Sequence, residues 1–260
     1  MRPIRSKLAI AALAGIAAIA LVGWSLAGAG QARPVLGLFT TLPIYWAETA
    51  DMSEMLAGQP HPGWVRPALE DRFELLPLDT LAAHGRGAAQ GLDDVDVLLL
   101  AQPRVLSPQE NVALDDWVRT GGHVLVFADP MLTSESRFAI GDKRRPQDVA
   151  LLSPILARWG LEMHFDPEQE RGERMVVTDL APLPVNISGT LHPVGGYPAS
   201  GEKCWIAYHR LFAQCAVGKG RATVVADAAL FENAQGERRD ARADALEWLT
   251  ESAFGAGAAR

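Results

Sequence analysis

The chain has 260 residues and a formal net charge of −7, a length that one α/β domain and a short N-terminal segment can fill. Its 24 basic residues include Arg2, Arg5 and Lys7, so the rest of the chain has 21 basic against 31 acidic residues, a balance of −10. Such a domain has no basic surface for nucleic acid or anionic lipid headgroups, and we therefore exclude both as its partners.

The N-terminus is predicted to lie in a membrane. Residues 1–7 form a basic tail, and Leu8–Ala29 is a run of 22 residues without a charge. As a helix this run is roughly 33 Å long, enough to cross the ~30 Å hydrocarbon core of a bacterial inner membrane. The basic flank predicts a cytoplasmic tail and a periplasmic domain. Cleavage of a signal peptide near Ala32 is the alternative, because Gly30 and Ala32 are small residues at the expected spacing.

Two apolar runs, Pro34–Thr40 and Phe73–Leu78, are expected as the first two strands. The turn after the first run contains Thr41 and two aromatic residues, Tyr45 and Trp46. These aromatic side chains could stack on a ligand, or they could simply cover an edge of the sheet.

The stretch from Asp94 to Pro130 predicts a complete strand–helix–strand unit. Val95–Leu100 is an unbroken apolar run, typical of a strand buried on both faces of a parallel sheet. Ser107 is placed as a helix N-cap, followed by Pro108 and, three residues after the cap, by a glutamate, which together make a capping box. Two glycines end the helix, and the second strand, "HVLVFA", follows at residues 123–128.

Shorter elements complete the expected fold. We predict a helix at Asp148–Trp159, strands at 161–165 and 174–180, a long surface loop at Pro182–Gly201, a hairpin with a three-residue turn at Gly218–Gly220, and a last helix at Asp240–Glu251. Ala241, Ala245, Trp248 and Leu249 should share the buried face of that helix. One domain is therefore expected over residues 34–252, with a disordered tail at 253–260.

The two cysteines, Cys204 and Cys215, lie 11 positions apart. If their segments form antiparallel strands, a cross-strand disulfide is geometrically possible, and an exported protein would form it. Two free buried thiols, or a metal site that includes His209 and His192, are the alternatives. The spacing matches no zinc pattern, so we favour the disulfide and expect neither a metal site nor a cofactor.

Three segments of the sequence carry a resemblance to a known family: "DVLLLAQPRVLSPQENVALDDWVRTGGHVLVFADP", "GKGRATVVADAALFEN" and "ALEWL". Together they resemble the glutamine-amidotransferase-like domain of uncharacterised ABC-transporter auxiliary proteins, the family that includes gliding-motility-type ABC components. The resemblance covers Pro34 to Leu249. It implies a flavodoxin-like, three-layer, mostly parallel α/β domain outside the cytoplasm, without amidotransferase activity.

A hydrolytic site is the competing hypothesis. Neither cysteine follows a strand and opens a helix, and no GxSxG elbow is present. Asp129 could be the acid of a site with Ser134 or Ser136, provided that His192 or His209 approaches. His123 cannot be the partner of Asp129, because it lies at the opposite end of the same strand, roughly 20 Å away at ~3.3 Å per residue.

The residues that follow the parallel strands form the candidate binding site. Parallel strands end at one edge of a sheet, and ligands bind there in open α/β folds. This edge is predicted to gather Thr41, Tyr45, Trp46, Gln102, Arg104, Asp129 and Asp227. Arg104 could bind a carboxylate or phosphate, or pair with Asp129 or Asp227; the two acids could hold a cation or be solvated. We therefore weigh two functions, a non-catalytic binding or scaffold domain that serves a transporter permease or an envelope assembly, and an exported hydrolase.

Overall fold

The computed structural model describes residues 33–48, 63–82, 91–196 and 203–255. The chain divides into two compact units, Met1–Arg33 and Pro34–Arg260, of which the second is described below. The basic tail, the Leu8–Ala29 segment and the cleavage site near Ala32 lie outside the described residues. Among the residues described, no helix is both long and apolar enough to cross a bilayer.

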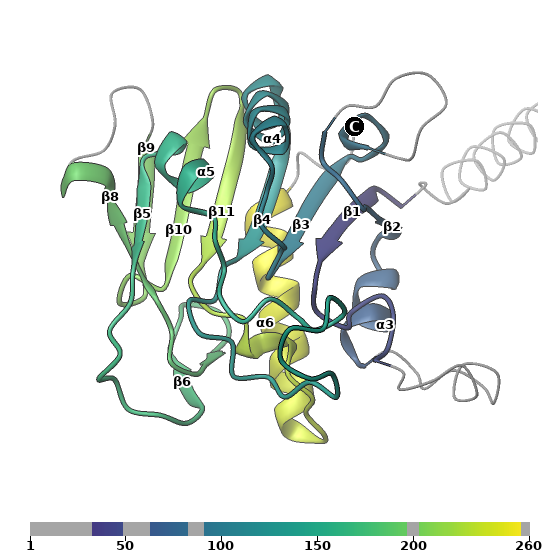
Figure 1. Cartoon of the computed structure of the whole chain (residues 1–260), viewed down its shortest axis with the longest axis vertical. Coiled ribbons are helices and arrows are strands. Elements are labelled where there is room, and N and C mark those ends of the chain that lie inside the picture. The colour runs from purple at the N-terminus through teal and green to yellow at the C-terminus, as the bar shows by residue number, and fades with distance from the viewer. Residues whose placement is uncertain (1–32, 49–62, 83–90, 197–202, 256–260) are drawn as a thin grey trace, which may run out of the picture. The chain divides into compact units, whose positions relative to one another are not determined.

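The second unit is a mixed α/β structure around a seven-stranded sheet with the order β2-β1-β3-β4-β11-β10-β9 (Figure 1). Its elements are β1 (Val35–Thr40), α3 (Val65–Glu70), β2 (Glu74–Pro77), η1 (Leu92–Asp94), β3 (Val97–Ala101), α4 (Pro108–Thr120), β4 (His123–Phe127), α5 (Ser153–Arg158), β5 (Leu161–His164), β6 (Arg174–Val176), β7 (Leu183–Val185), β8 (Thr190–Pro193), η2 (Val194–Gly196), β9 (Lys203–Ala207), β10 (Phe212–Val217), β11 (Gly220–Val225), η3 (Ala229–Phe231) and α6 (Glu237–Phe254). The strands from β2 to β11 are mutually parallel, whereas β10 is antiparallel to both of its neighbours.

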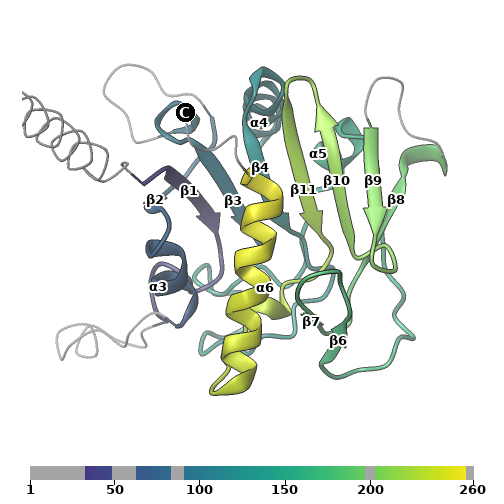
Figure 2. The ribbon, with the colours of Figure 1, turned by 180° about the vertical axis from the view of Figure 1, so that it is seen from behind.

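Helices cover both faces of the sheet. Figure 1 shows α4 and α5 on one face, and Figure 2, the view from behind, shows α6 on the other. The central strands β3 and β4 are therefore buried on both sides, and every residue of Val97–Ala101 is at most 1% exposed. This burial explains why both strands read as continuous apolar runs rather than as alternating ones.

The β3–α4–β4 unit confirms the prediction from the sequence. The Ser107 hydroxyl accepts a hydrogen bond from the Glu110 backbone N–H (3.2 Å), and the Glu110 carboxylate accepts one from the Ser107 backbone N–H (2.9 Å). Pro108 is the first helical residue, and Gly121 ends the helix with a φ of 133°, a conformation that L-residues with side chains rarely adopt. Leu114 and Val118 face the core.

The prediction of a surface loop over Pro182–Gly201 was wrong. The segment contains β7 and β8, which form small antiparallel sheets with β6 and β5, respectively, outside the main sheet. Leu183, Val185 and Leu191 are at most 2% exposed. Proline lacks an N–H group, but a short two-stranded ladder tolerates it where no bond from that residue is needed. The proline and glycine content therefore hid short buried strands.

Several element boundaries also differ from the predictions. Helix α5 begins at Ser153 rather than Asp148, because Pro154 fits only the first turn of a helix. The hairpin turn contains two residues rather than three: Val217 pairs with Gly220, and a side chain on Gly218 would lie 2.6 Å from the Arg119 carbonyl oxygen at the end of α4. This close approach, together with its φ of 60°, requires glycine at the position.

Helix α6 is longer than predicted and extends from Glu237 to Phe254. Ala245, Trp248 and Leu249 face the core as expected, whereas Ala241 is only half-buried. Ala253 and Phe254, assigned to the tail by sequence, are buried residues of the helix. Residues 256–260 lie outside the described part of the chain.

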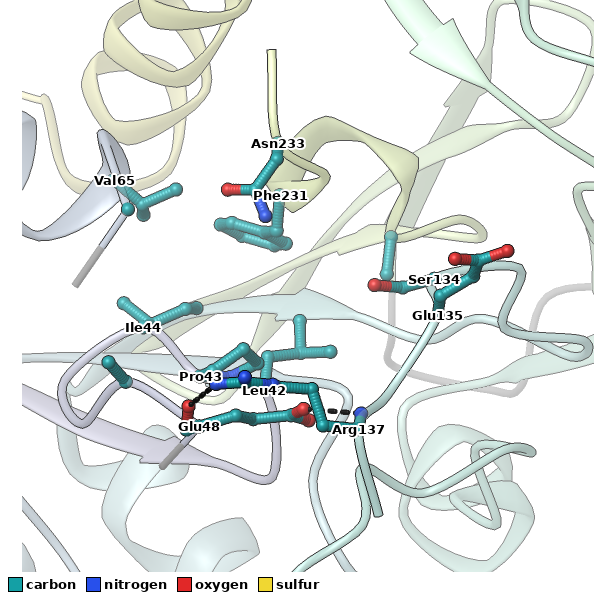
Figure 3. Close-up of a pocket in the computed structure, with 13 residues that line it drawn as sticks. Leu42, Pro43, Ile44, Glu48, Val65, Ser134, Glu135, Arg137, Phe231 and Asn233 are labelled. Atoms are coloured by element: carbon teal, nitrogen blue, oxygen red, sulfur yellow. Dashed lines mark hydrogen bonds between the residues drawn. The ribbon is translucent and has the colours of Figure 1, made fainter. Parts of the chain in front are cut away.

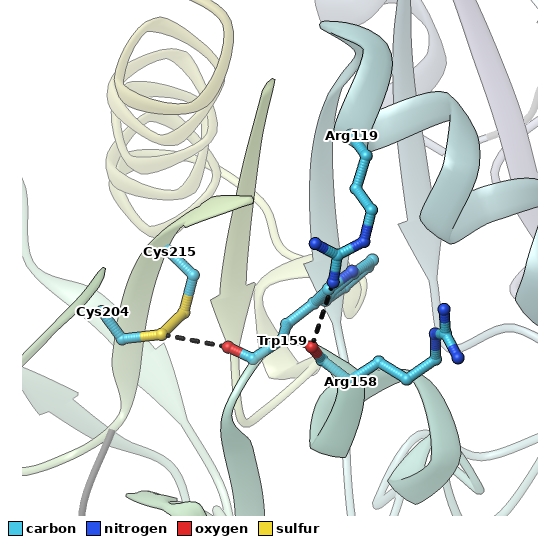
Figure 4. The surroundings of a disulfide bond; sticks show 5 residues. All are labelled: Arg119, Arg158, Trp159, Cys204 and Cys215. Atoms are coloured by element: carbon cyan, nitrogen blue, oxygen red, sulfur yellow. Dashed lines mark hydrogen bonds between the residues drawn. A yellow bond between two sulfur atoms is a disulfide. The ribbon is translucent and has the colours of Figure 1, made fainter. Parts of the chain in front are cut away.

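The predicted disulfide is confirmed. Cys204 on β9 is directly opposite Cys215 on β10, with a Cα–Cα distance of 4.0 Å, and the two form a disulfide (Figure 4). The Cys204 sulfur lies 3.3 Å from the backbone carbonyl of Trp159, at the end of α5. The cross-link therefore ties the edge strand of the sheet to its neighbour and packs beneath α5.

Candidate functional site

Four parallel strands, β1, β3, β4 and β11, end at one edge of the sheet. Thr40 pairs with Ala101, Ala101 with Phe127, and Phe127 with Val225. Polar residues lie one or two positions after the ends of these strands and are consequently brought together: Thr41, Gln102, Asp129 and Asp227. We refer to this place as the carboxyl edge.

Gln102 holds the carboxyl edge together. Its side-chain amide donates to the backbone carbonyls of Asp129 (3.1 Å) and Gln147 (2.8 Å), and its side-chain oxygen accepts from the Asp129 backbone N–H (2.9 Å). The Thr41 hydroxyl donates to the Gln102 carbonyl (2.5 Å) and accepts from the Gln147 N–H (2.9 Å). Gln102 is completely buried and has a φ of 45°, which is unusual for a residue with a side chain. The residue is therefore a buried clamp between three loops.

Asp129 and Asp227, which we call the acid pair, are buried, with 0% and 2% exposure. The Asp129 carboxylate accepts the backbone N–H groups of Met131 (2.8 Å) and Ala228 (3.1 Å). The Asp227 carboxylate accepts those of Ala229 (2.6 Å) and Asn186 (2.9 Å). The expectation of solvated acids was wrong: both carboxylates replace water as the acceptors for buried loop backbone.

The acid pair has strongly perturbed acidity. Burial raises the pKa of Asp129 to about 6, against the opposing effect of its two backbone hydrogen bonds. Burial also raises the pKa of Asp227 well above its ordinary value, and the neighbouring Asp129 carboxylate raises it further. Glu232 adds a like charge that acts in the same direction on both. The two acids therefore compete for ionisation.

Arg104 pairs with neither acid, so the predicted partners were wrong. Its guanidinium makes two hydrogen bonds to the Glu110 carboxylate, of 2.8 and 2.9 Å, and one of 2.7 Å to the Asp79 carbonyl. Burial alone would raise the pKa of Glu110, but hydrogen bonds from Arg104, Ser107 and Leu81 outweigh it and lower that pKa to about 2. The strand–helix turn places Arg104 beside the capping residue of its own helix, which sequence spacing alone did not reveal.

Tyr45 and Trp46 lie in the loop after β1. Tyr45 is half-buried beneath the Arg66 guanidinium, 4.2 Å from its ring centroid, and Arg66 also donates to the Tyr45 carbonyl (3.0 Å). Trp46 packs edge-on against Tyr45 and remains 68% exposed. The aromatic pair is thus held in place on one side and exposed on the other.

A pocket of about 270 Å³, the rim pocket, opens among these loops (Figure 3). Its apolar part is lined by residues that follow β1, begin α3 or follow β11: Leu42, Pro43, Ile44, Ala47, Val65, Ala228 and Phe231. Ala228 is also a hydrogen-bond donor to Asp129, so the acid pair fixes one wall of the pocket. No local pattern in the sequence predicts the pocket, because the residues that form its walls come from distant segments.

The polar part of the rim pocket comes from Glu48, Ser134, Glu135, Arg137 and Asn233. The Glu48 carboxylate accepts the Ser136 hydroxyl and the Arg137 backbone N–H, both at 2.8 Å. In Figure 3, Ser134 and Glu135 lie on the side opposite Ile44 and Val65. The pocket is therefore lined by both apolar and polar residues.

The residues of the hydrolytic hypothesis do not converge. The Ser136 hydroxyl is bonded to Glu48, whereas His192 contacts Thr190 (3.0 Å), Arg210 (3.3 Å) and the stacked ring of His164. His209 is exposed in the β9–β10 turn. Within the described ranges, no group of three or more metal-ligating side chains has the geometry of a metal site.

Comparison with known proteins gives one family. A family profile described as an ABC-type uncharacterized transport system matches residues 33–172. No curated protein matches the chain.

Solved structures give only distant likenesses. An exo-β-1,4-mannosidase from Opitutaceae bacterium strain TAV5 is 14% identical, with a TM-score of 0.43, over 88% of this chain and 35% of the mannosidase. A cold-adapted β-galactosidase from Rahnella sp. R3 is 12% identical, with a TM-score of 0.45, over 85% of this chain and 31% of the enzyme. A cytoplasmic protein from Salmonella typhimurium is 11% identical, with a TM-score of 0.41, over 84% of this chain and 98% of that protein. The chain spans about a third of the two glycosidases, and TM-scores below 0.5 support no inference about its function.

Proposed function

Because the chain belongs to the family described as an ABC-type uncharacterized transport system, we propose that it is a non-catalytic binding or scaffold domain auxiliary to such a system. In this proposal Leu8–Ala29 anchors the domain at the inner membrane, and the domain binds a permease or an envelope protein from the periplasmic side. The basic flank and the length of the uncharged segment support the anchor and its orientation.

We also assign the domain to the flavodoxin-like, amidotransferase-like group. The strand order β2-β1-β3-β4-β11 supports this assignment, because it corresponds to the 2-1-3-4-5 order of flavodoxin-like sheets. Strands β10 and β9 extend this sheet on one side. In such a fold the carboxyl edge is the expected place for a ligand or partner.

The observation that best supports a non-catalytic role is the state of the carboxyl edge. The acid pair is buried and accepts hydrogen bonds from four backbone N–H groups. The Gln102 side chain is likewise hydrogen-bonded to backbone atoms. Side chains whose polar atoms are hydrogen-bonded to loop backbone serve to position those loops. The exposed surface beside them, which includes Trp46 and the rim pocket, is then available to a partner.

Photo-crosslinking in cells tests the transporter role. A photoreactive phenylalanine analogue replaces Trp46 in the full-length chain, and mass spectrometry identifies the cross-linked proteins. We expect a permease or ATPase subunit of an ABC transporter. The control position is Val112, which is 52% exposed on α4. Equal cross-linking of the same subunit from both positions, or none from Trp46, would contradict the proposal.

The topology has its own test. A reporter that is active only in the cytoplasm is fused after Arg260 of the full-length chain. We expect no reporter activity, and activity would overturn the periplasmic orientation. An N-terminus at Arg33 in the mature protein, determined by mass spectrometry, would establish cleavage in place of a retained anchor.

A further inference from the structure

The rim pocket is large enough for one large side chain. Its volume of about 270 Å³ lies below the ~300–1,000 Å³ typical of small-molecule sites. It exceeds the ~150 Å³ of an apolar cavity that accommodates benzene. One large aliphatic or aromatic side chain therefore fits it.

The walls of the pocket favour an apolar group. Leu42, Ile44, Val65 and Ala228 are at most 6% exposed, so they form a packed floor. The acid pair and the Gln102 clamp fix the loops that carry this floor. A pocket that is already formed loses little conformational entropy when it is filled.

The mouth of the pocket favours a cation. The Glu48 carboxylate accepts hydrogen bonds from the Ser136 hydroxyl and the Arg137 backbone N–H, whereas Glu135 is exposed and has no hydrogen bond or ion pair within the described part of the chain. Among the described residues that line the pocket, Glu48, Glu135 and Arg137 together carry a formal charge of −1. A basic residue beside the apolar group would meet this charge.

A large exposed aromatic residue immediately precedes one of the residues that line the pocket. Trp46 precedes Ala47, which lines the pocket. The Trp46 ring packs edge-on against Tyr45, and the Arg66 guanidinium lies over the Tyr45 ring. Tryptophan is enriched among the residues that dominate binding energy at protein interfaces.

From these features we propose that the rim pocket is a socket for one large apolar side chain of a polypeptide partner, with a lysine or arginine next to it in the partner's sequence. This rests on the proposed function, because it takes the domain to be a binding module. Trp46 covers the flank of the bound segment, and Glu135 pairs with the basic residue.

Short peptides test the socket directly. The probe is acetyl-Ser-Leu-Lys-Ser-amide, with matched peptides in which leucine is replaced by alanine or lysine by glutamate, and binding to the full-length chain is measured by ligand-observed NMR. We expect the leucine peptide to bind about tenfold more tightly than the alanine peptide, the loss that corresponds to about 1.4 kcal/mol of buried apolar side chain. Equal binding of the two peptides would overturn the proposal.

A charge swap tests the mouth. Glu135→Lys should weaken binding of the lysine peptide several-fold and strengthen binding of the glutamate peptide. The control is Glu170→Lys, an exposed acid between β5 and β6, which should change neither. If both variants act alike, the effect is one of net charge, and the specific role of Glu135 is refuted.

A blocked pocket completes the test. Ala47→Trp fills the pocket and should abolish peptide binding, whereas Ala139→Trp, at an exposed position, should not. Circular dichroism checks that each variant is folded. If Ala47→Trp does not fold, Ser134→Trp is used to block the pocket from another part of its lining. A self-association of the chain that Ala47→Trp abolishes, measured by sedimentation, would show that a second copy is the occupant and would overturn the proposal.

The transporter role and the socket can be refuted independently of each other. Peptide binding requires no transporter, so binding without a cross-link to an ABC subunit refutes the proposed function and leaves the socket. A cross-link at Trp46 without peptide binding refutes the socket and leaves the transporter role.

Discussion

The molecule buries carboxylates in two regions, and the two differ in what neutralises them. On helix α4, Asp115 is completely buried but accepts hydrogen bonds from Arg119, Arg158 and the Trp159 indole. Burial opposes its ionisation, yet the two arginines hold the pKa of Asp115 below its ordinary value. At the carboxyl edge, the acid pair has backbone N–H donors and a like charge instead, and both pKa values are raised. The ionised carboxylate on α4 therefore stabilises the folded state. Ionisation of the acid pair, which lies beside the rim pocket, destabilises the folded state.

The largest expected effect concerns Asp115. Asp115→Ala removes a buried carboxylate that two guanidinium groups and the Trp159 N–H share as an acceptor, and we expect a loss of about 3 kcal/mol in the free energy of unfolding. Urea denaturation at pH 7 measures it. The matched control is Asp116→Ala, the exposed neighbour on the same helix, for which we expect a change below about 0.5 kcal/mol. Equal losses would mean that helix propensity, and not the buried acid, explains the result.

Arg104 should show a smaller effect with a defined pH dependence. Arg104→Ala leaves Glu110 with N–H donors alone, and we expect a loss of about 2 kcal/mol at pH 7. Because Arg104 helps to lower the pKa of Glu110 to about 2, the stability from this pair is present above pH 4.5 and is lost as the pH falls toward 2. The difference between variant and wild type should therefore shrink in acid. The control, Arg144→Ala, removes a surface pair whose side chains are 62% and 28% exposed, and it should not change stability measurably.

The acid pair should show the opposite pH dependence. Its raised pKa values mean that the folded protein binds more protons than the unfolded chain between about pH 4 and pH 7, so stability falls as the pH rises through about 6. Asp129→Asn removes one charge, and we expect it to reduce this fall by about 1–2 kcal/mol between pH 5 and pH 8. Urea denaturation across that range measures the slope. An unchanged slope would mean that the two carboxylates do not share a raised pKa.

Trp46 should show no effect on stability. Its side chain is 68% exposed, so Trp46→Ala should change the free energy of unfolding by less than about 0.5 kcal/mol. The same variant should weaken binding of the leucine peptide several-fold. A large loss of stability would place Trp46 among the structural residues, with Arg104 and Asp115.

Local signals in the sequence predicted the parts of the fold that local physics determines. The capping box at Ser107, the glycines after α4 and the long apolar runs located β3, α4 and β4 to within two residues. The antiparallel pairing of Cys204 and Cys215 followed from their spacing once the strands formed. In each case the determining contacts lie within a few residues along the chain or across one hairpin.

The remaining features depend on contacts between distant segments. Strand β8 is short, and its pairing with β5, which lies far earlier in the chain, is what defines it. Which acids are buried was equally hidden, since Asp129 and Asp227 read as ordinary turn residues until Ala228, Ala229 and Asn186 supply their donors. The rim pocket was missed because its walls come from several loops, and no periodic pattern records such a meeting.

The disulfide has a consequence for how the sheet edge behaves toward other chains. Because Cys204 faces Cys215 directly, a slip of two residues would set it against Ala213 or Val217 and separate the sulfur atoms. Once oxidised, β9 can neither shift along β10 nor leave it to pair with a strand of another copy. The disulfide therefore prevents β9 from exchanging between molecules for as long as the bond persists. Such strand exchange is a common route by which proteins with open sheet edges aggregate.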